Sequence, residues 1–217
     1  MRPGPSAFVR PDCTANCSSP PNSDPNHPWE PRMHGGPCGD CKMGTNPGRT
    51  HRFYTGDAVV PFGFGLSYST FSYGLVDAPA GPVRLDAVRD MLAQTKSDGR
   101  IFPDSHMLRA APPTVKYAVN VTNTGSVDAD EVVLGLLKPP GAGVDGVPLQ
   151  TLYGFERVFL KAGETKTVQL YPAMDDLTQV DKNGERYALS GEYTFSFGVQ
   201  HEAGPEMAFA QHAVTMV

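Results

Sequence analysis

The second half of the chain is dominated by apolar and polar residues that alternate one by one. The clearest stretch covers residues 114–122, where an apolar side chain stands at every second position. Its apolar members are Val115, Tyr117, Val119 and Val121. Because successive side chains of a β-strand point to opposite faces, this period of two predicts a strand with one face in a core and the other toward solvent.

Further strands are predicted at a spacing of roughly 10 residues. They cover Ser69–Val76, Glu131–Leu137, Leu152–Leu160, Thr165–Tyr171, Tyr193–Phe197 and Met207–Val217. Turn formers separate them, among them the Asn-Thr-Gly sequence at 123–125 and the Asn-Gly sequence at 183–184, which is a strong hairpin signal. Short strands with turns at regular intervals predict an all-β fold, a β-sandwich over residues 113–217.

Residues 77–112 have a different pattern. Apolar residues recur on one helical face over Val83–Ala93, with charged residues between them, which predicts a short amphipathic helix. Gly99 is placed to end the helix in the left-handed conformation. We interpret 77–112 as an insertion between the first and second strands, and we expect residues 114–217 to fold in isolation.

The N-terminal part of the chain shows no period of two or of 3.6 residues. Prolines crowd residues 1–48, and each one keeps the residue before it out of the helical conformation. We predict an irregular Pro/Cys-rich loop over 1–48 that either packs on another surface or is disordered, with 1–45 mobile when isolated. Residues 49–76, where aromatic and small residues alternate, form a connecting segment and the first strand.

Charge and hydropathy exclude several classes of partner. The net charge is -5 at pH 7 and the pI is about 5.6, so we expect neither nucleic acid nor a membrane surface as a partner. No run approaches the roughly 18 apolar residues of a membrane-spanning helix. The residues after Met1 lack the apolar stretch of a signal peptide. We therefore expect either an intracellular protein or a piece of a longer one, and we favour the second.

Several motifs, taken together in chain order, resemble glycoside hydrolase family 3. Residues 46–56 (NPGRTHRFYTG) and 61–71 (PFGFGLSYSTF) resemble the segment that joins the second catalytic domain of that family to its C-terminal module. Residues 119–125 (VNVTNTG) resemble the opening of its fibronectin type III-like domain, and residues 152–158, 160–164 and 191–194 resemble later strands. Residues 1–13 are similar to a loop of the β-xylosidase and α-L-arabinofuranosidase branch.

This resemblance implies a fibronectin type III-like (immunoglobulin-like) β-sandwich with a long irregular N-terminal extension. Family members carry a (β/α)8 barrel with an aspartate nucleophile and an α/β sandwich domain with the general acid/base, and no part of this chain resembles either domain. The implied function is that of a non-catalytic module of an enzyme that hydrolyses O-glycosyl bonds in xylan or arabinoxylan breakdown, inactive when alone.

The resemblance also implies partners and a location. The expected partners are the catalytic domains of the parent enzyme, with polysaccharide as a further candidate, and no cofactor is expected. The implied location is extracellular or in the secretory pathway. The alternative is a stand-alone β-sandwich with a binding or adhesion role, because one sandwich fold supports many functions.

The carboxylates of the chain do not predict a catalytic pair. A retaining glycosidase needs two carboxyl groups about 5 to 5.5 Å apart. The candidates are Asp128, Asp130, Glu131, Glu156, Asp175 and Asp176. Most of them lie beside turns, where solvated carboxylates are the ordinary case, and Glu156 beside Arg157 favours a surface ion pair. We therefore assign no catalytic residue.

All cysteines of the chain lie in its first 48 residues. They are Cys13, Cys17, Cys38 and Cys41, and His27 and His34 stand between the two pairs. Such ligands suit a tetrahedral zinc site, but no strand-turn pattern surrounds either pair. Disulfides are the ordinary state of cysteines in a secreted protein, so we predict two disulfides, or one disulfide with two free thiols, and no metal site. The pairing stays open, since four cysteines allow three connectivities.

Two asparagines match the acceptor pattern for N-linked glycosylation. Asn16 begins an Asn-Cys-Ser sequence and Asn120 begins an Asn-Val-Thr sequence. Asn120 falls on the polar side of its predicted strand, where a glycan is sterically allowed.

The aromatic residues between positions 53 and 73 have two possible roles. They are suited to stack on sugar rings or to pack against a neighbouring domain, and we favour the second role. Phe53 and Tyr54 lie furthest upstream. They are therefore the candidates for contact with a catalytic domain or a sugar.

Overall fold

The computed structural model of the protein describes residues 49–56, 58, 60–97, 105–181, 183–198 and 209–217. The chain divides into two compact units, Met1–Val60 and Pro61–Val217. The described part of the first unit contains the short helix α1 (Thr50–Phe53). The irregular loop predicted over 1–48, with its expected mobility, lies outside the described residues.

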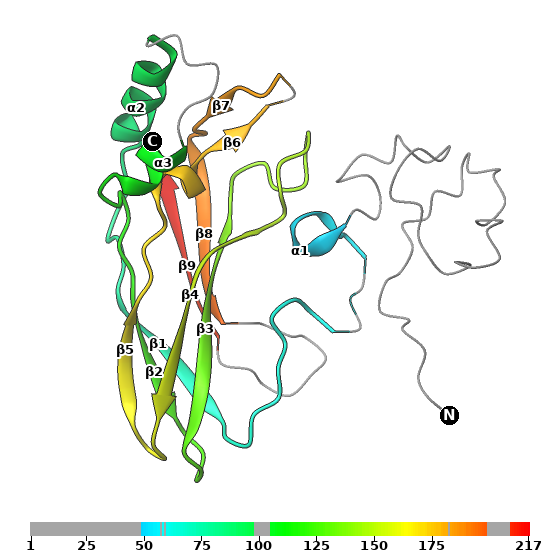
Figure 1. The fold of residues 1–217 in the computed structure, drawn as a ribbon, viewed down its shortest axis with the longest axis vertical. Coiled ribbons are helices and arrows are strands. Elements are labelled where there is room, and N and C mark those ends of the chain that lie inside the picture. The colour runs from blue at the N-terminus through cyan, green and yellow to red at the C-terminus, as the bar shows by residue number, and fades with distance from the viewer. Residues whose placement is uncertain (1–48, 57, 59, 98–104, 182, 199–208) are drawn as a thin grey trace, which may run out of the picture. The chain divides into compact units, whose positions relative to one another are not determined.

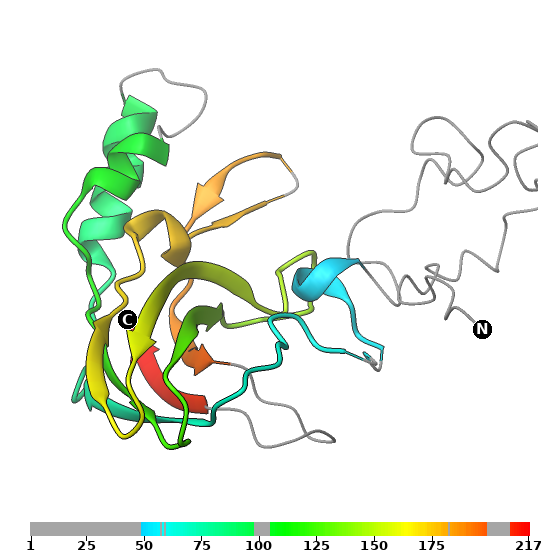
Figure 2. The ribbon, with the colours of Figure 1, turned by 60° about the horizontal axis from the view of Figure 1, so that its bottom comes forward.

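The second unit is a β-sandwich of two antiparallel sheets (Figure 1). One sheet has the strand order β1-β2-β5 and the other the order β4-β3-β8-β9. The strands are β1 (Phe71–Asp77), β2 (Ala118–Asn123), β3 (Ala129–Lys138), β4 (Thr151–Leu160), β5 (Thr165–Gln169), β8 (Gly191–Gly198) and β9 (Phe209–Met216). Figure 2 shows the two sheets as separate layers.

A small hairpin and a single 3-10 turn complete the sandwich. The hairpin pairs β6 (Gln179–Val180) with β7 (Arg186–Tyr187), and its turn contains the Asn-Gly sequence that predicted it. Gly184 takes a φ of 83°, which a glycine adopts without steric cost. The 3-10 helix η1 (Met174–Leu177) precedes the hairpin.

The core lies between the two sheets and follows the predicted alternation. On β2, Val119 and Val121 are fully buried, while Ala118, Asn120 and Thr122, which alternate with them, are partly exposed. The ring centroid of Tyr117, directly before β2, lies 4.7 Å from that of Phe195 and 5.2 Å from that of Phe197 on β8, so aromatic side chains meet between the two sheets. Such pairs contribute about 0.5–1.5 kcal/mol each beyond the area they bury. The prediction of an all-β sandwich is confirmed.

The helix predicted over Val83–Ala93 begins later in the structure. Helix α2 covers Asp86–Ser97, because the residues before it are engaged with β9. Val83 forms a parallel bridge to Met216, and its amide donates a hydrogen bond to the Thr215 carbonyl at 2.9 Å. The backbone therefore stays extended up to Asp86, whose carboxylate is favourable in the first turn of a helix.

A second helix, α3 (Ser105–Ala110), is too short to show a periodic pattern and was not predicted. The segment with α2 and α3 buries Leu85, Val88, Leu92 and Leu108 in the same hydrophobic cluster as the strands. Residues 77–112 are therefore part of the core and not an addition to a complete sandwich. This differs from the expectation that residues 114–217 are sufficient to fold.

Asn123 joins several segments at the end of β2. It is fully buried, and its Oδ1 accepts hydrogen bonds from the Ser69 hydroxyl at 2.6 Å and the Gly125 amide at 3.0 Å. Its Nδ2 donates to the carbonyls of Val127 at 2.8 Å and Leu160 at 3.1 Å. Gly125 has no room for a side chain, since an added Cβ would clash with the Ser69 hydroxyl. The predicted turn at 123–125 thus connects the segment before β1 with the end of β4.

Candidate functional site

The outer face of the three-stranded sheet carries small polar residues. We call seven outward residues at the centre of this sheet the polar face: Ser72, Gly74, Asn120, Thr122, Thr165, Thr167 and Gln169. At the end of β1, beyond this set, Asp77 pairs with Ala118 on the same side and Val76 is 58% exposed. The Thr167 hydroxyl donates a hydrogen bond to Asn120 Oδ1 at 2.7 Å, and the hydroxyl oxygens of Thr122 and Thr165 lie 2.7 Å apart. This face is therefore uncharged, and neighbouring side chains hydrogen-bond to one another across the strands.

The outer face of the four-stranded sheet carries large apolar residues instead. Val132 on β3 and Phe155 and Phe159 on β4 are 44%, 66% and 48% exposed. The strand register places them on one side of the sheet together with Leu134. We call these four residues the apolar patch. Exposed apolar residues gathered on one sheet face mark an interaction site more often than single ones do. Here they flank the ion pair of Arg157 with Asp130, which lies on the same face.

A β-bulge in β4 decides which side chains face outward. The pairing of β3 with β4 shifts in register between Gly135 and Leu136, which leaves Tyr153 as the extra residue of β4. Tyr153 turns toward the core, where its ring lies edge-on to Phe195 at a centroid distance of 6.0 Å. Gly135 leaves room for this ring, since a Cβ there would lie 2.7 Å from it. In a strand without the bulge, Phe155 would point to the opposite face.

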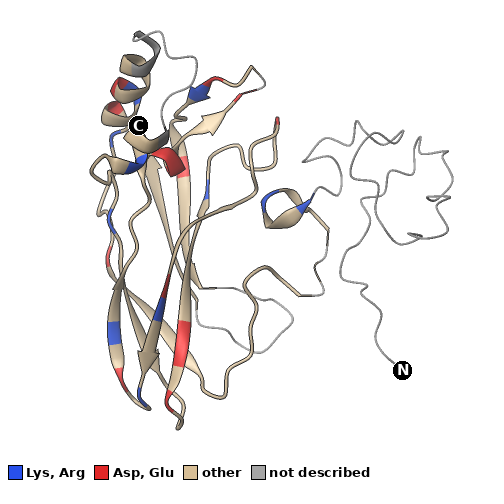
Figure 3. Ribbon diagram, in the orientation of Figure 1, with Lys and Arg blue, Asp and Glu red and all other residues tan. Residues whose placement is uncertain are grey.

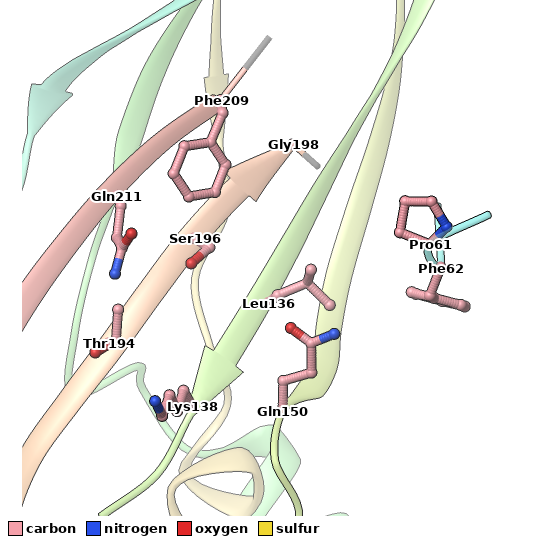
Figure 4. Close-up of a pocket in the computed structure, with 10 residues that line it drawn as sticks. All are labelled: Pro61, Phe62, Leu136, Lys138, Gln150, Thr194, Ser196, Gly198, Phe209 and Gln211. Carbon is pink, nitrogen blue, oxygen red and sulfur yellow. The ribbon is translucent and has the colours of Figure 1, made fainter. Parts of the chain in front are cut away.

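The same outer face also carries a pocket of about 310 Å³ (Figure 4). It is lined by Pro61, Phe62, Leu136, Lys138, Gln150, Thr194, Ser196, Gly198, Phe209 and Gln211. In Figure 4, Phe209 and Gln211 stand on one side of the pocket and Pro61 and Phe62 on the other. Side-chain amides and hydroxyls and the Lys138 ammonium group, beside aromatic rings, suit a ligand that carries several hydroxyl groups.

Charged residues are unevenly spread over the strands. Figure 3 shows that β9, at one edge of the four-stranded sheet, carries no Lys, Arg, Asp or Glu. On the outer face of β3 and β4, Arg157 pairs with Asp130 at 2.8 Å. Both side chains of this pair are exposed, so the pair contributes little to stability.

The aromatic residues predicted as one contact surface are divided in the structure. Phe71 and Tyr73 lie on the inward side of β1 and pack against the core, so they do not belong to an outer surface. Tyr68, before β1, is 98% exposed. Phe53 and Tyr54 belong to the first unit, where the Arg52 guanidinium lies 5.4 Å from the ring centroid of Phe53. Contact of Phe53 and Tyr54 with a catalytic domain or a sugar stays a prediction.

Three of the candidate carboxylates hold the sheets and their turns together. Asp128 accepts a hydrogen bond from the Ala162 amide at 2.8 Å, and Asp130 pairs with Arg157 as described. Glu131 accepts a hydrogen bond from the Tyr73 hydroxyl at 2.6 Å, which links β3 to β1. Burial raises the pKa of the Glu131 carboxyl, although the Tyr73 hydrogen bond acts in the opposite direction.

The carboxylates of η1 have structural partners too. Asp175 forms ion pairs with Arg109 at 3.2 Å and with Arg186 at 2.6 Å, and so ties η1 to α3 and to β7. Asp176 accepts a hydrogen bond from the Ala173 amide at 2.8 Å, and burial raises its pKa. Glu156 is exposed on β4. Structural contacts account for Asp175 and Asp176 without a catalytic role.

Several predicted sites lie outside the described residues. These are the disulfide candidates Cys13, Cys17, Cys38 and Cys41, and the glycosylation candidate Asn16. Within the described ranges, no group of three or more His, Cys, Asp or Glu side chains is placed to hold a metal ion. None of the helices in the described part of the chain is long and apolar enough to cross a membrane.

Comparison with known proteins defines the class of the second unit. Residues 131–200 match the family model of the fibronectin type III-like domain. The solved structure of a beta-glucosidase from Listeria innocua has the same fold, with a TM-score of 0.54 and 19% identity over 81% of this chain and 21% of that chain. A GH3 beta-glucosidase from Bifidobacterium adolescentis has a TM-score of 0.51 and 26% identity over 75% of this chain and 19% of that chain. The second unit therefore contains a fibronectin type III-like domain.

Curated relatives identify the family. Beta-D-xylosidase 1 of Arabidopsis thaliana is 36% identical over 159 residues, which are 71% of this chain and 20% of the relative. The exo-1,4-beta-xylosidase bxlB of Emericella nidulans is 37% identical over 158 residues, which are 72% of this chain and 19% of the relative. The chain thus spans about a fifth of the length of these relatives. It belongs to the C-terminal, fibronectin type III-like region of glycoside hydrolase family 3.

Proposed function

We propose that the chain is a non-catalytic module of a family 3 glycosidase that hydrolyses O-glycosyl bonds in xylan-type polysaccharides, and that its apolar patch packs against the catalytic part of that enzyme. One observation carries the proposal: Phe155 is 66% exposed on a sheet face that also presents Phe159 and Val132. Burial of a large apolar side chain is worth about 1.5–3 kcal/mol relative to exposure, so a partner surface would be stabilised by covering the patch.

A cellular location and the state of the cysteines are part of the same proposal. The location is extracellular or in the secretory pathway, where Cys13, Cys17, Cys38 and Cys41 form disulfides. Titration of free thiols in the secreted chain tests this, because four reactive thiols without a reductant would contradict it. Phe53, together with Tyr54, then contacts the catalytic part or a sugar bound to it.

The docking proposal is tested in a chimera. The region of the Arabidopsis thaliana relative that matches this chain is replaced by the chain, and hydrolysis of a nitrophenyl xyloside and the melting temperature are measured. Phe155→Asp with Phe159→Asp is expected to lower both, because two charges would enter the interface. Thr165→Asp with Thr167→Asp is the matched control on the polar face and is expected to leave both unchanged.

Two further measurements separate lost docking from unfolding of the module itself. In the isolated chain, the double substitution at Phe155 and Phe159 is expected to cost at most about 2 kcal/mol and to leave a cooperative unfolding transition, since both side chains are exposed and only Phe159 lies opposite a carboxylate, that of Asp130. A chimera that tolerates the double substitution would contradict docking through the patch. Hydrolysis of the xyloside by the purified chain alone would contradict a non-catalytic role.

We propose sugar binding at the pocket as a second candidate function, which would suit a stand-alone binding module. It is supported by the combination of Gln150, Gln211 and Thr194 with the ring of Phe209 around one pocket. Xylo-oligosaccharides are titrated into the full chain and binding is followed by calorimetry. Gln211→Ala is expected to weaken binding about tenfold, which corresponds to a hydrogen bond worth about 1.4 kcal/mol.

The matched control for the pocket is Gln169→Ala, because Gln169 is also a strand glutamine but lies on the polar face. It is expected to leave the affinity for xylo-oligosaccharides unchanged. Equal loss of affinity in the two variants, or no binding by the unaltered chain, would rule the pocket out as a sugar site.

A further inference from the structure

Asn120 has an open space on one side, toward β1, and a hydrogen-bond partner on the other, on β5. It lies on β2, the central strand of its sheet, with Gly74 of β1 and Thr167 of β5 as its neighbours in the register. Its Oδ1 accepts a hydrogen bond from the Thr167 hydroxyl at 2.7 Å, so the amide oxygen faces β5. Because the oxygen and nitrogen of a side-chain amide point in different directions, Nδ2 is turned away from β5.

On the β1 side of Asn120, the neighbour in the register is Gly74, and the space above it is open. Gly74 has no side chain, and a Cβ built on it would meet nothing within 4 Å. A substituent on Asn120 Nδ2 therefore has room to leave the sheet above Gly74. A β-branched or aromatic residue, the usual occupant of a strand, would fill this space.

The surroundings of Asn120 suit a carbohydrate. The residues paired with Asn120 and Thr122 are glycine, serine and threonines, so a sugar placed directly above them would cover neither a charge nor a large apolar group. The exposed Val76 and Asp77 lie further along, at the end of β1. Thr122, two residues after Asn120, points to the same face and completes the acceptor sequence. This placement contrasts with the outer face of the other sheet, where Phe155 and Phe159 are exposed.

We propose that Asn120 carries an N-linked glycan when the chain passes through a eukaryotic secretory pathway, and that the glycan marks the polar face as the solvent side of the sandwich. In this transfer, a bond forms between Asn120 Nδ2 and C1 of a polyprenyl-diphosphate-linked oligosaccharide. The bond from C1 to the diphosphate breaks, the amide nitrogen loses one proton and the polyprenyl diphosphate leaves. The inference does not depend on the proposed partner domains.

The experiment is secretion of the full chain from a eukaryotic host behind a cleavable leader, with Asn16→Gln present to remove the other acceptor. The secreted chain is treated with peptide N-glycosidase in heavy-oxygen water, and its peptides are mapped by mass spectrometry. The expected result is conversion of Asn120 to labelled aspartate, with a mobility shift of the intact chain that the enzyme removes. Asn120→Gln and Thr122→Ala are each expected to abolish both signals.

A matched control separates the acceptor sequence from the local fold. Thr165→Ala removes the hydroxyl that pairs with Thr122 but leaves the acceptor sequence intact, so glycan attachment is expected to persist. If the chain or a variant is not secreted, import into microsomes gives the same readout without the need for export. A secreted or imported chain with unmodified Asn120 would overturn the proposal.

The assignment of the polar face as the solvent side is tested by a separate measurement. The glycosylated and enzymatically deglycosylated forms are expected to have the same melting temperature, because the glycan would contact only the polar face. A large change in melting temperature on removal of the glycan would show that the sugar packs on more of the sandwich than this face and would overturn the assignment of a free solvent side.

Discussion

The two outer faces of the sandwich are built by the same strand geometry but carry opposite chemistry. On the three-stranded sheet, outward positions hold residues such as Thr165 and Thr167, whose hydroxyls are oriented by neighbours. On the four-stranded sheet, outward positions hold Phe155 and Phe159. Both sheets bury their inward residues in one common core.

This difference shows that the inward and outward positions of a strand are determined by different requirements. The period of two decides which residues are inside, and a fold needs nothing more from the outward positions than that they tolerate water. Where outward positions carry large apolar groups, the fold does not account for them, because exposure of such groups gives no stability. The apolar patch is therefore best accounted for by a partner, and the polar face by contact with solvent or sugar.

The largest effect is expected from removal of the residues that pack the two sheets against each other, because neither outer face exists without the sandwich. A chain that begins at Thr114 lacks β1 and the buried Leu85, Val88, Leu92 and Leu108. Each of these buried side chains is worth about 1.5–3 kcal/mol, and their sum rivals the typical 5–15 kcal/mol stability of a domain. We expect no cooperative unfolding transition in thermal circular dichroism.

The control for this truncation is a chain that begins at Pro61, the start of the second unit. It retains β1, α2 and α3 and is expected to unfold cooperatively. If the two truncated chains unfolded cooperatively at the same temperature, residues 114–217 would be sufficient to fold and the longer unit proposed here would be contradicted.

A smaller effect is expected from Asn123→Ala, which removes the amide that connects the segment before β1 with the end of β4. Four hydrogen bonds of the buried side chain are lost, at about 1 kcal/mol each, so we expect a loss of about 3–4 kcal/mol in the free energy of unfolding. Urea denaturation of the bacterially produced chain measures it. Asn120→Ala, on the same strand but on the polar face, is the matched control and should cost under about 1 kcal/mol.

Equal destabilisation by the two asparagine substitutions would mean that the polar face contributes to stability as much as the buried junction does. In that case the separation of an outward, functional asparagine from an inward, structural one would be lost.

The alternation of residues 114–122 was sufficient to predict the buried side of β2, because every large apolar residue of the stretch has the same parity. The strand itself begins at Ala118, four residues later than predicted. The start of α2 was not predictable, since the pairing of Val83 with Met216 depends on a contact between residues far apart in the sequence. Burial of Leu85 and Leu108 in the sandwich core could not be read from a local helical pattern either.

The candidate surfaces were less predictable than the fold. Phe155 and Phe159 are four residues apart, so the sequence indicates that they lie on the same side of a strand, opposite to Leu160. Its direction depends on the bulge at Tyr153, which an alternating pattern does not reveal. The pocket joins Phe62, Gln150 and Gln211, and only the folded chain brings these residues together.

The smallest expected effect concerns Glu131, the half-buried carboxyl that connects β3 of one sheet with Tyr73 of the other. Burial raises the pKa of this carboxyl above its ordinary value of 4.5, so the folded chain holds a proton that the unfolded chain has already lost. The free energy of unfolding must therefore fall as pH rises from about 4.5 through the folded pKa. Glu131→Gln is expected to flatten this slope in urea denaturation measured at a series of pH values.

The matched substitution acts in the opposite direction. Tyr73→Phe removes the hydrogen bond that favours the ionised carboxylate, so the pKa of Glu131 should rise further and the slope should become steeper. Asp176 retains a contribution of the same sign in both variants, because burial raises its pKa as well. If Glu131→Gln leaves the pH dependence of the free energy of unfolding unchanged, the Glu131 carboxyl is as well hydrated as the side chains on the outer faces. The space between the sheets would then be open to water at this edge of the sandwich.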